Sequence, residues 1–297
     1  MDGNSLTNFY MQHLDRLFEN AGFRKTFLCY NKLFGIPPKE NDRELYKQLF
    51  LVYLDEAEFA LSILRKLKFS KKDVILEMGG GLGFVYGFLK TCGFDVYSIE
   101  PSQSGYAGYY ETALQMFKIL GIDSSDWYPF FAEDCGKINT TFDIIFSYGV
   151  LEHVRDLRQT LLGLKRVLKP RGKMIHWTVN YLIPYEPHFK LLLVPFSPGT
   201  TSSFKPSLKH SPLWDGLNFV TAGRLRRACR ACGLDIKFER GVVLESFQRL
   251  REAGFARRQK HFLPFYYFLE KTGLINALNL IPIQFTTPLV IALKHQK

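Results

Sequence analysis

The chain has 297 residues, enough to bury the core of one large domain or of one domain with additions. Hydrophobic residues make up 46% of it and aromatic residues 15%, a composition that excludes a disordered chain. The net charge of +11 permits attraction to nucleic acid, anionic lipid or an acidic substrate, and a solvated basic surface explains it at least as well.

The cysteines and the hydropathy bear on the compartment. Five cysteines are scattered without the spacing of a disulfide framework, which predicts reduced thiols in the cytoplasm. Cys229 and Cys232 form a C-x-x-C pair, but no second Cys/His pair stands near them in the sequence, so we expect no metal site. The first ten residues do not resemble a signal peptide, and no run of 18 apolar residues predicts a membrane span.

Residues 1–70 are predicted to form a helical region. Apolar residues recur with a helical period from Leu6 to Leu17 and again from Glu44 to Leu67. Pro37 and Pro38 separate the second helix from the preceding segment. We therefore expect a helical region at 1–70 and a domain at 71–297.

Strands and helices alternate over the centre of the chain. Short apolar runs predict strands at Val74–Met78, Asp95–Ile99, Tyr128–Phe131, Phe142–Ser147 and Lys173–Val179. Helical periods predict helices at Phe84–Cys92, Gly105–Leu120, Leu157–Leu168 and Thr221–Cys232. Such alternation indicates an α/β fold, in which helices cover both faces of a mostly parallel sheet. Because ligands bind beyond the carboxyl ends of such strands, the loops after the first four should form one site.

The first strand runs into a glycine-rich turn that begins the next helix. Glycines let the backbone turn sharply and approach a ligand closely, and the helix start offers free N–H groups. The dinucleotide fingerprint G-x-G-x-x-G fits no register, because Phe84 and Tyr86 stand where its last glycine would be. The G-K-[ST] of a P-loop is absent as well. What is present is Glu77-x-Gly79-x-Gly81-x-Gly83.

This turn resembles motif I of the class I S-adenosylmethionine-dependent methyltransferases. Three later segments resemble the same family in the same order: Glu100 at the end of the second strand, FDIIFSYGVLEHV over the fourth strand and its loop, and LKRVLKPRGKMIHW over the next helix, turn and strand. The fourth-strand segment is similar to the group that includes quinone-biosynthesis enzymes. The resemblance covers Val74 to Val179.

The resemblance implies a Rossmann-like, doubly wound sheet of seven strands. The sheet is mostly parallel, and its last strand is antiparallel and inserted beside the sixth. In this chain Leu234–Phe238 matches the sixth strand and Pro288–Leu293 the last. The N-terminal helices and an insertion after strand five, residues 180–218, are additions to this fold.

The resemblance also implies S-adenosylmethionine as the cofactor. Glu100 can accept both ribose hydroxyl hydrogens, and Glu77 is expected against the methionine part. Asp134, or alternatively Glu133, is expected to contact the adenine amino group. The expected cofactor-binding residues are Glu77, Gly79, Gly81, Gly83, Glu100, Glu133, Asp134 and Tyr148.

Methyl transfer from a sulfonium is an in-line displacement that needs alignment and, for a hydroxyl nucleophile, a base. His153 is the first candidate, because its ordinary near-neutral pKa suits proton removal. The alternative is that Glu152 and His153 shape the cofactor pocket or begin a helix. Some relatives hold a metal with such a pair, but no third carboxylate is evident, so we expect no metal.

The insertion at 180–218 supplies the second set of catalytic candidates. Its aromatic content argues against disorder, and in the family the corresponding insertion covers the acceptor pocket. Tyr185, Glu186 and His188 are the polar groups expected to face the acceptor, with ordinary loop surface as the alternative for Glu186 and His188. The stretch NYLIPYEPHF resembles a segment of bacterial methyltransferases that modify glycans or lipid-linked sugars.

An apolar, aromatic segment at 255–282 follows a basic cluster. Pro264, Glu270, Lys271 and Gly273 interrupt it, so it cannot cross a bilayer as an unbroken helix. Three interpretations stay open: packing on the acceptor side, a homodimer surface, and contact with a membrane interface.

The leading hypothesis is a cytoplasmic or membrane-associated S-adenosylmethionine-dependent methyltransferase. Its acceptor is expected to be oxygen on a small molecule, a glycan or a lipid-linked compound. N-methylation or RNA methylation is the alternative among enzymes, although nucleic acid is not the expected partner. A catalytically silent binding protein with this fold is the alternative of another class, which the intact glycine motif and Glu100 disfavour.

Overall fold

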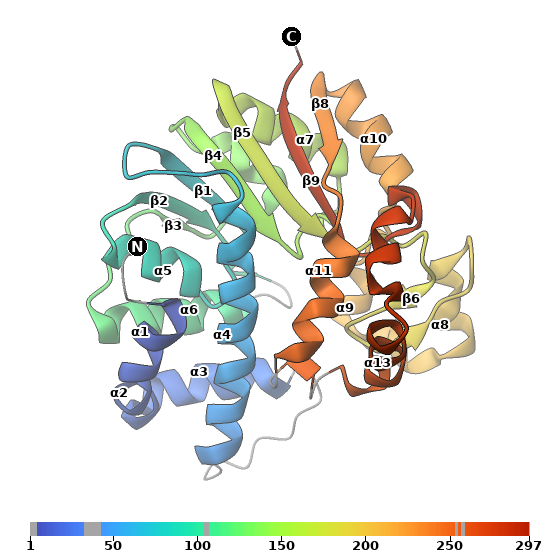
Figure 1. The fold of residues 1–297 in the computed structure, drawn as a ribbon. Coiled ribbons are helices and arrows are strands. Elements are labelled where there is room, and N and C mark those ends of the chain that lie inside the picture. The colour runs from blue at the N-terminus through green and yellow to red at the C-terminus, as the bar shows by residue number, and fades with distance from the viewer. Residues whose placement is uncertain (1–4, 33–42, 104–106, 253–254, 257–258, 297) are drawn as a thin grey trace. The chain divides into compact units, whose positions relative to one another are not determined.

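The main sheet has seven strands in the order β3-β2-β1-β4-β5-β9-β8 (Figure 1). They are β1 (Val74–Met78), β2 (Asp95–Ile99), β3 (Trp127–Tyr128), β4 (Phe142–Tyr148), β5 (Leu168–Thr178), β8 (Leu234–Phe238) and β9 (Leu289–His295). β1 runs parallel to β2 and β4, β2 runs parallel to β3, and β9 runs antiparallel to β8. The expected seven-stranded, mostly parallel sheet is confirmed, with its antiparallel last strand beside the sixth.

Pro37 and Pro38 lie outside the residues that the computed structural model describes, which are 5–32, 43–103, 107–252, 255–256 and 259–296. Two strands differ most from their expected bounds: β5 begins at Leu168 instead of Lys173, and β3 ends at Tyr128 instead of Phe131. Pro129 has no N–H to donate to a neighbouring strand. The N–H of Phe130 donates instead to the carbonyl of Tyr128 at 2.9 Å, and this turn ends the strand.

The first predicted helix is divided at His13. It forms α1 (Leu6–Gln12) and α2 (Leu14–Glu19), with His13 ending the one and preceding the other. The other helices of this part of the chain are α3 (Ala21–Lys32), α4 (Arg43–Arg65), α5 (Phe84–Thr91), α6 (Ala107–Leu120) and α7 (Leu157–Val167). A 3₁₀ helix, η2 (Ala132–Lys137), follows β3.

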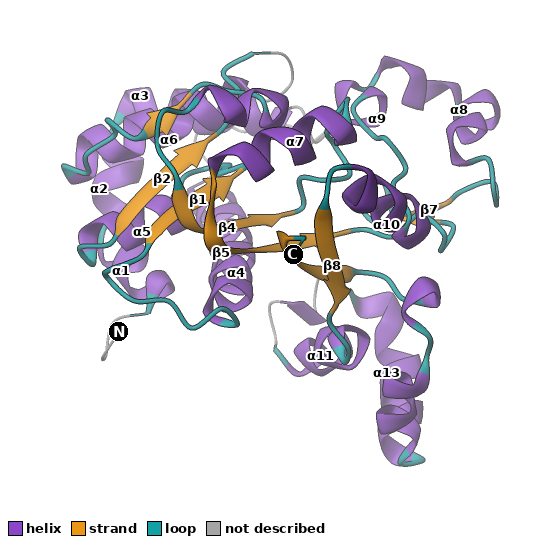
Figure 2. Ribbon diagram, turned by 90° about the horizontal axis from the view of Figure 1, so that it is seen from above, coloured by secondary structure: helices purple, strands orange, loops and turns teal. Residues whose placement is uncertain are grey.

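Internal contacts divide the chain into two compact units. Unit 1 comprises Met1–Tyr148 and Gln159–Ile175, and unit 2 comprises Gly149–Arg158 and His176–Lys297. The N-terminal helices are part of unit 1, because the Tyr10 hydroxyl donates to the carbonyl of Phe84 at 2.9 Å and Phe50 packs edge-on against the Phe84 ring. Figure 2 shows α4 and α7 on opposite sides of β1 and β4, as a doubly wound sheet requires.

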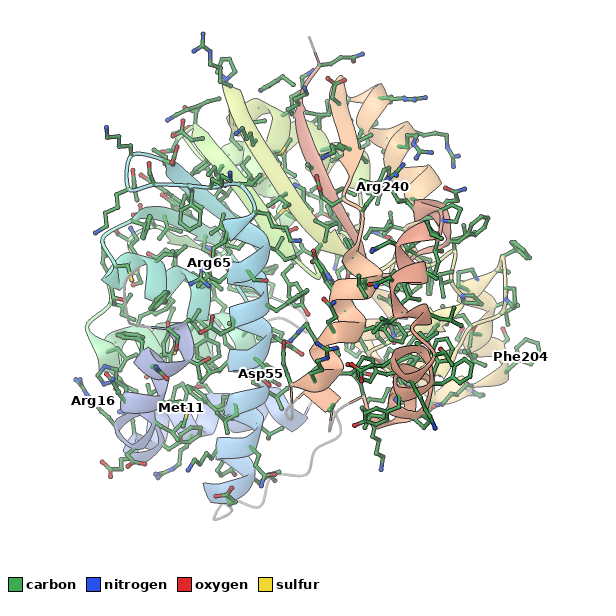
Figure 3. The ribbon with its side chains drawn as sticks, in the orientation of Figure 1. Met11, Arg16, Asp55, Arg65, Phe204 and Arg240 are labelled. Carbon is green, nitrogen blue, oxygen red and sulfur yellow. The ribbon has the colours of Figure 1, made fainter. Side chains whose placement is uncertain are left out.

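The insertion at 180–218 is ordered and belongs to unit 2. It contains the hairpin β6 (Tyr185–Glu186) and β7 (Leu191–Leu192), then η3 (Pro198–Thr200), α8 (Thr201–Phe204), η4 (Pro206–His210) and α9 (Pro212–Asp215). It has a small core of its own, formed with the end of β5, that contains Val179, Tyr181, Leu193, Leu208, Trp214 and Leu217. Tyr181, Phe189 and Trp214 thus pack in this core, whereas Phe196 is 97% and Phe204 81% exposed, and Phe204 projects from α8 (Figure 3).

Unit 2 continues with α10 (Ala222–Ala231) and, beyond β8, a series of short helices. These are α11 (Val242–Gln248), η5 (Arg249–Arg251), η6 (Lys260–Phe262), α13 (Leu263–Lys271), η7 (Leu274–Leu280) and η8 (Ile283–Phe285). Among the described residues, no helix combines the length and the hydropathy that crossing a bilayer would require.

Candidate active site

The glycine-rich turn after β1 takes a backbone course that glycine favours. Gly79, Gly81 and Gly83 have φ angles of 77°, 57° and 76°, in the left-handed region. The N–H groups of Gly79 and Gly80 donate to the carbonyl of Ile99 at 2.9 and 3.2 Å, which ties the turn to the end of β2. The turn thus brings the ends of the first two strands together, as the sequence predicts.

The glycines of this turn serve different purposes. A Cβ on Gly83 would lie 2.4 Å from the ring of Phe117, and one on Gly80 would lie 2.5 Å from the ring of Trp127. These two positions are small because elements of unit 1 pack tightly against them. A Cβ on Gly81 would meet nothing within 4 Å. Packing therefore explains Gly80 and Gly83, whereas the space beside Gly81 is open to a ligand.

Glu100 joins the turn from the end of β2. It is buried, and its Oε2 accepts a hydrogen bond from the N–H of Gly81 at 2.8 Å. Burial raises the pKa of the Glu100 carboxyl to about 8, although the N–H of Gly81 works in the opposite direction. A buried carboxylate beside open space is suited to accept hydrogen bonds from ligand hydroxyls.

Glu77 has protein partners of its own. The hydroxyl of Ser98 donates to its Oε2 at 3.5 Å, and the backbone N–H of Tyr86 in the first turn of α5 also donates to it. Burial and the charge of Glu100 raise the pKa of Glu77 well above its usual range. Glu77 thus bonds one of the N–H groups that a helix start leaves unpaired. Its contact with the methionine part of a cofactor stays a prediction.

The remaining expected cofactor residues lie at the ends of later strands of unit 1. Glu133 and Asp134 are in the first turn of η2, and the Asp134 carboxylate pairs with Lys137 at 2.9 Å. Tyr148 is the last residue of β4, and its ring packs edge-on against Phe59 at 5.6 Å. These positions follow strands whose ends meet at one edge of the sheet, so they fit a nucleotide-like ligand.

The acceptor candidates meet in unit 2. Glu186 is fully buried on β6, and its Oε1 lies 2.6 Å from Nδ1 of His188. The Glu186 carboxylate also accepts from the hydroxyl of Tyr181 at 3.2 Å and from the N–H of Phe189 at 2.6 Å. The ring of His153 lies 5.2 Å from that of His188. The structure thus brings together all three residues that the sequence nominated for catalysis.

The two histidines differ in their surroundings. The side chain of His188 is 31% exposed, whereas His153 is half-buried and its Nδ1 atom is shielded from solvent. Burial, together with the nearby His188, lowers the pKa of His153 to about 3. This value departs from the near-neutral pKa on which the choice of His153 as base depends. Of the two imidazoles, His188 is the better placed to exchange a proton with a ligand.

A second buried carboxylate lies in the loop after β4. The Glu152 Oε2 accepts from the hydroxyl of Thr178 at 2.8 Å, and its Oε1 is buried without a hydrogen-bond partner among the described residues. Burial raises the pKa of Glu152. The side-chain amide of Asn218 fixes this loop by donating to the carbonyls of Leu151 and Val154 at 2.7 and 2.9 Å.

Sequence reasoning did not nominate Thr178, Tyr181 or Asn218 as parts of the site. Tyr181 counted only as an aromatic residue of the insertion, and neither Thr178 nor Asn218 belongs to a motif. Within the part of the chain that the structure describes, no three His, Cys, Asp or Glu side chains gather as a metal ion would require. Cys229 and Cys232 are buried, and the Cys232 thiol lies 3.8 Å from the carbonyl of Arg158.

The profile of the methyltransferase domain family matches residues 47–237, more than half of the chain. The chain belongs to this family. The methyltransferase is 27% identical over 198 residues to the uncharacterised protein Rv1509 of Mycobacterium tuberculosis, covering 64% of this chain and 67% of that one. It is 26% identical over 215 residues to the sterol 4-C-methyltransferase strm-1 of Caenorhabditis elegans, covering 64% and 60%.

A solved structure with a similar fold is phosphoethanolamine N-methyltransferase 2 of Haemonchus contortus, in complex with S-adenosyl-L-methionine. Its TM-score is 0.51 at 17% identity, and the match covers 86% of this chain and 59% of that one. The chain therefore spans about 60% of the length of the Haemonchus contortus N-methyltransferase and of the Caenorhabditis elegans sterol methyltransferase. The family, the fold and the S-adenosylmethionine-dependent methyltransferase activity expected from the sequence are confirmed.

Proposed function

We propose that this enzyme methylates a hydroxyl oxygen of a small-molecule, glycan or lipid-linked acceptor, with His188 as the general base. The observation that carries the proposal is the 2.6 Å contact between Nδ1 of His188 and the buried carboxylate of Glu186. An ionised carboxylate only accepts hydrogen bonds, so it selects the tautomer of His188 that carries its hydrogen on Nδ1. Nε2 then presents a lone pair to the acceptor.

Glu186 holds this base in position. Its other hydrogen bonds, from Tyr181 and Phe189, fix the carboxylate on the β6–β7 hairpin. When His188 takes a proton on Nε2, the carboxylate stabilises the imidazolium that forms. This is the same logic by which an acid orients a histidine in other enzymes that activate a hydroxyl.

Residues of unit 1 hold the cofactor in this proposal. The open space at Gly81 and the buried carboxylate of Glu100 fit its ribose, and Asp134 or Glu133 would contact the adenine amino group. Gly79, Gly83, Glu77 and Tyr148 would complete that surface. S-adenosylmethionine supplies an electrophilic methyl carbon and a neutral thioether leaving group.

The atoms balance with no further reagent. The acceptor oxygen uses a lone pair to bond the methyl carbon while the carbon–sulfur bond breaks toward sulfur. The hydroxyl proton goes to Nε2 of His188 and from there to water. A hydroxyl gains more from such a base than an amine does, because a neutral amine already offers its lone pair.

The test is a single-turnover comparison on a panel of phenols, sugars and lipid-linked sugars, with product methyl ethers identified by mass spectrometry. Replacing His188 by Ala should lower the rate of methyl transfer about 10²–10⁴-fold, the range for a lost general base. The same variant should bind S-adenosylhomocysteine with unchanged affinity in calorimetry. His210→Ala is the matched control, because His210 is exposed elsewhere in the same insertion.

Two results would contradict the proposal. One is a methylated amine or carbon as the only product across an extended panel. The other is a rate that survives His188→Ala within about tenfold but falls in His153→Ala, which would return the base assignment to His153. If His188→Ala lost affinity for S-adenosylhomocysteine instead of rate, the pair would belong to cofactor binding.

A further inference from the structure

Unit 2 exposes a group of large hydrophobic side chains on consecutive elements. Most of the large hydrophobic residues that the described chain exposes lie here, and we call this group the α13–η8 face. It consists of Phe262, Phe265, Tyr267, Phe268, Leu274, Leu280, Ile281 and Phe285. Exposed apolar groups of this extent mark sites of interaction on a folded protein.

The helix α13 presents its aromatic residues outward and is fixed in that orientation. Phe265, Tyr267 and Phe268 are 50%, 59% and 56% exposed, whereas Tyr266 and Leu269 of the same helix are buried. The hydroxyl of Tyr266 and the carboxylate of Glu270 both bond the guanidinium of Arg251, at 2.7 and 2.5 Å. These anchors leave Tyr267 and Phe268 facing outward, while the ring of Phe265 also packs edge-on against Phe247 at 5.9 Å.

A cavity of about 410 Å³ adjoins this face. Leu280 and Ile281 belong to both, since they line the cavity and are among the exposed residues. Arg226 of α10 and Arg240 after β8 also line it, and neither forms an ion pair among the described residues. The guanidinium of Arg226 lies over the ring of Phe238 at 5.1 Å, which holds it in place. Glu239 lines the cavity as well, but its carboxylate pairs with Lys237 at 3.1 Å. The cavity thus combines two guanidinium groups with an apolar rim.

We propose that the α13–η8 face docks on the surface of a bilayer that contains anionic phospholipid. The aromatic side chains lie in the interfacial layer, and Arg226 and Arg240 hold a headgroup phosphate in the adjoining cavity. Guanidinium groups suit phosphate because their planar N–H donors match its oxygens. Aromatic side chains suit the interface, where an apolar ring can be buried while polar atoms stay wet.

Charge favours this occupant over a second copy of the chain. Residues 249–285 contain six Lys or Arg against two Glu, within a chain of net charge +11. An isologous dimer would place this basic segment against its own copy, and the like charges would repel. An anionic lipid surface attracts the segment instead, because each Lys or Arg close to it adds favourable electrostatic energy. The docking proposal does not depend on the identity of the methyl acceptor.

The test is co-sedimentation of the full chain with vesicles of phosphatidylcholine alone and of phosphatidylcholine with 30 mol% phosphatidylglycerol, about a third anionic as the charge argument requires. We expect binding to the anionic vesicles that weakens as salt rises, and at least tenfold weaker binding to the neutral ones. Replacing Phe268 by Trp should give a fluorophore whose emission shifts to the blue on the anionic vesicles and is quenched by brominated acyl chains.

Matched variants separate the two parts of the surface. Phe265→Glu with Phe268→Glu should reduce binding to anionic vesicles at least tenfold. Arg226→Gln with Arg240→Gln should reduce it by about fivefold per arginine. Phe204→Glu and Arg230→Gln are the controls, because Phe204 is an exposed aromatic residue of α8 and Arg230 an exposed arginine of α10 outside the cavity. Far-ultraviolet circular dichroism checks that each variant is folded.

Several outcomes would overturn the proposal. Equal binding to neutral and anionic vesicles would show that the arginines do not recognise phosphate. If the wild type bound neither kind of vesicle, the α13–η8 face would not be a membrane-docking surface. A vesicle-independent dimer that Phe268→Glu converts to monomer would assign the face to a second copy. Variants of the face that lose no more binding than Phe204→Glu and Arg230→Gln would place the lipid contact elsewhere. None of these results bears on methyl transfer, which is measured separately.

Discussion

The two units place their functional residues in different ways. In unit 1 the turn after β1 and the end of β2 make the arrangement, and its central hydrogen bond joins Gly81 and Glu100, nineteen positions apart. In unit 2 the amide of Asn218 bonds the carbonyl of Leu151, 67 positions away. In unit 1 the backbone course of one turn positions the site residues. In unit 2 side-chain hydrogen bonds position them, over short range for Glu186 and His188 and over long range for the loop after β4.

The buried titratable groups differ in the same way. In unit 1, burial favours protonated carboxyls at Glu77 and Glu100, which have raised pKa values. In unit 2, burial keeps the imidazoles of His153 and His176 neutral by lowering their pKa values to about 3. Burial in unit 1 thus holds carboxyl protons that a ligand can displace, whereas burial in unit 2 makes His153 and His176 weak bases.

The largest expected effect tests whether the backbone course at Gly81 forms the cofactor site of unit 1. Gly81→Val should abolish measurable binding of S-adenosylhomocysteine, because the side chain fills the open space beside the turn. Gly121→Val is a closely matched control, since Gly121 also has a positive φ, 71°, and nothing within 4 Å of its Cβ position. Both variants place a branched side chain at a positive φ, which strains the backbone. If calorimetry showed loss of binding in both, strain and not the filled space would be the cause.

A second prediction tests the hydrogen bond between the side chains of Glu186 and His188 in unit 2. Glu186→Gln should lower kcat by about 10²–10³-fold, because a glutamine can donate to Nδ1 and so select the wrong tautomer of His188. Affinity for S-adenosylhomocysteine should stay within about twofold, which a general loss of structure would not allow. Glu252→Gln, at an exposed carboxylate of the same unit, is the control. Equal kcat in the two variants would remove Glu186 from the mechanism.

A third and smaller effect is the number of protons that the protein releases when it binds S-adenosylhomocysteine. If ribose hydroxyls bond the Glu100 carboxylate, binding favours its ionised form and releases the proton that burial retains. With a pKa of about 8, the ligand-free protein should release close to one proton at pH 7 and about half a proton at pH 8. Calorimetry of S-adenosylhomocysteine in buffers of different ionisation enthalpy measures this count, and Glu100→Gln should abolish it.

The same shift fixes the sign of a stability effect. The pKa of Glu100 in the folded protein lies above the ordinary value near 4.3. The stability that the protonated Glu100 carboxyl contributes is therefore fully present below about pH 4.3. The contribution is lost as the pH rises through about 8. The melting temperature of the ligand-free protein should therefore fall between pH 5 and 8, less so in Glu100→Gln. A melting temperature that rises over this range in the wild type alone would contradict the raised pKa.

The sequence predicts the sheet well where apolar runs meet clear boundaries. The limits of β1 and β2 agree with the prediction, because each strand is a short apolar run bounded by a turn. β3 does not, because Pro129 ends a run whose aromatic residues continue to Phe131. A pattern of apolar residues cannot show which backbone donor is missing its partner, so the strand was predicted too long.

The acceptor part was predicted only as a set of residue types. Glu186 and His188 are polar groups in an aromatic insertion, and that contrast is visible in the sequence. Their pairing is not, since it depends on the two-residue strands of the β6–β7 hairpin. The low pKa of His153 follows from burial, and burial of a loop residue is a property of the folded chain. For the same reason, nothing in the sequence marks Asn218.

The small core that the insertion forms has a consequence for how such enzymes diversify. None of the residues in that core comes from Met1–Tyr148, and the proposed catalytic pair, Glu186 and His188, stands on a hairpin attached to it. Recombination that replaces residues 179–218 as a block would bring most of that interior with it and leave the turn at Gly81 unaltered. A family of enzymes could thus keep one way of binding the methyl donor and change its acceptor by exchanging this segment. The same exchange is a strategy for building chimaeric enzymes.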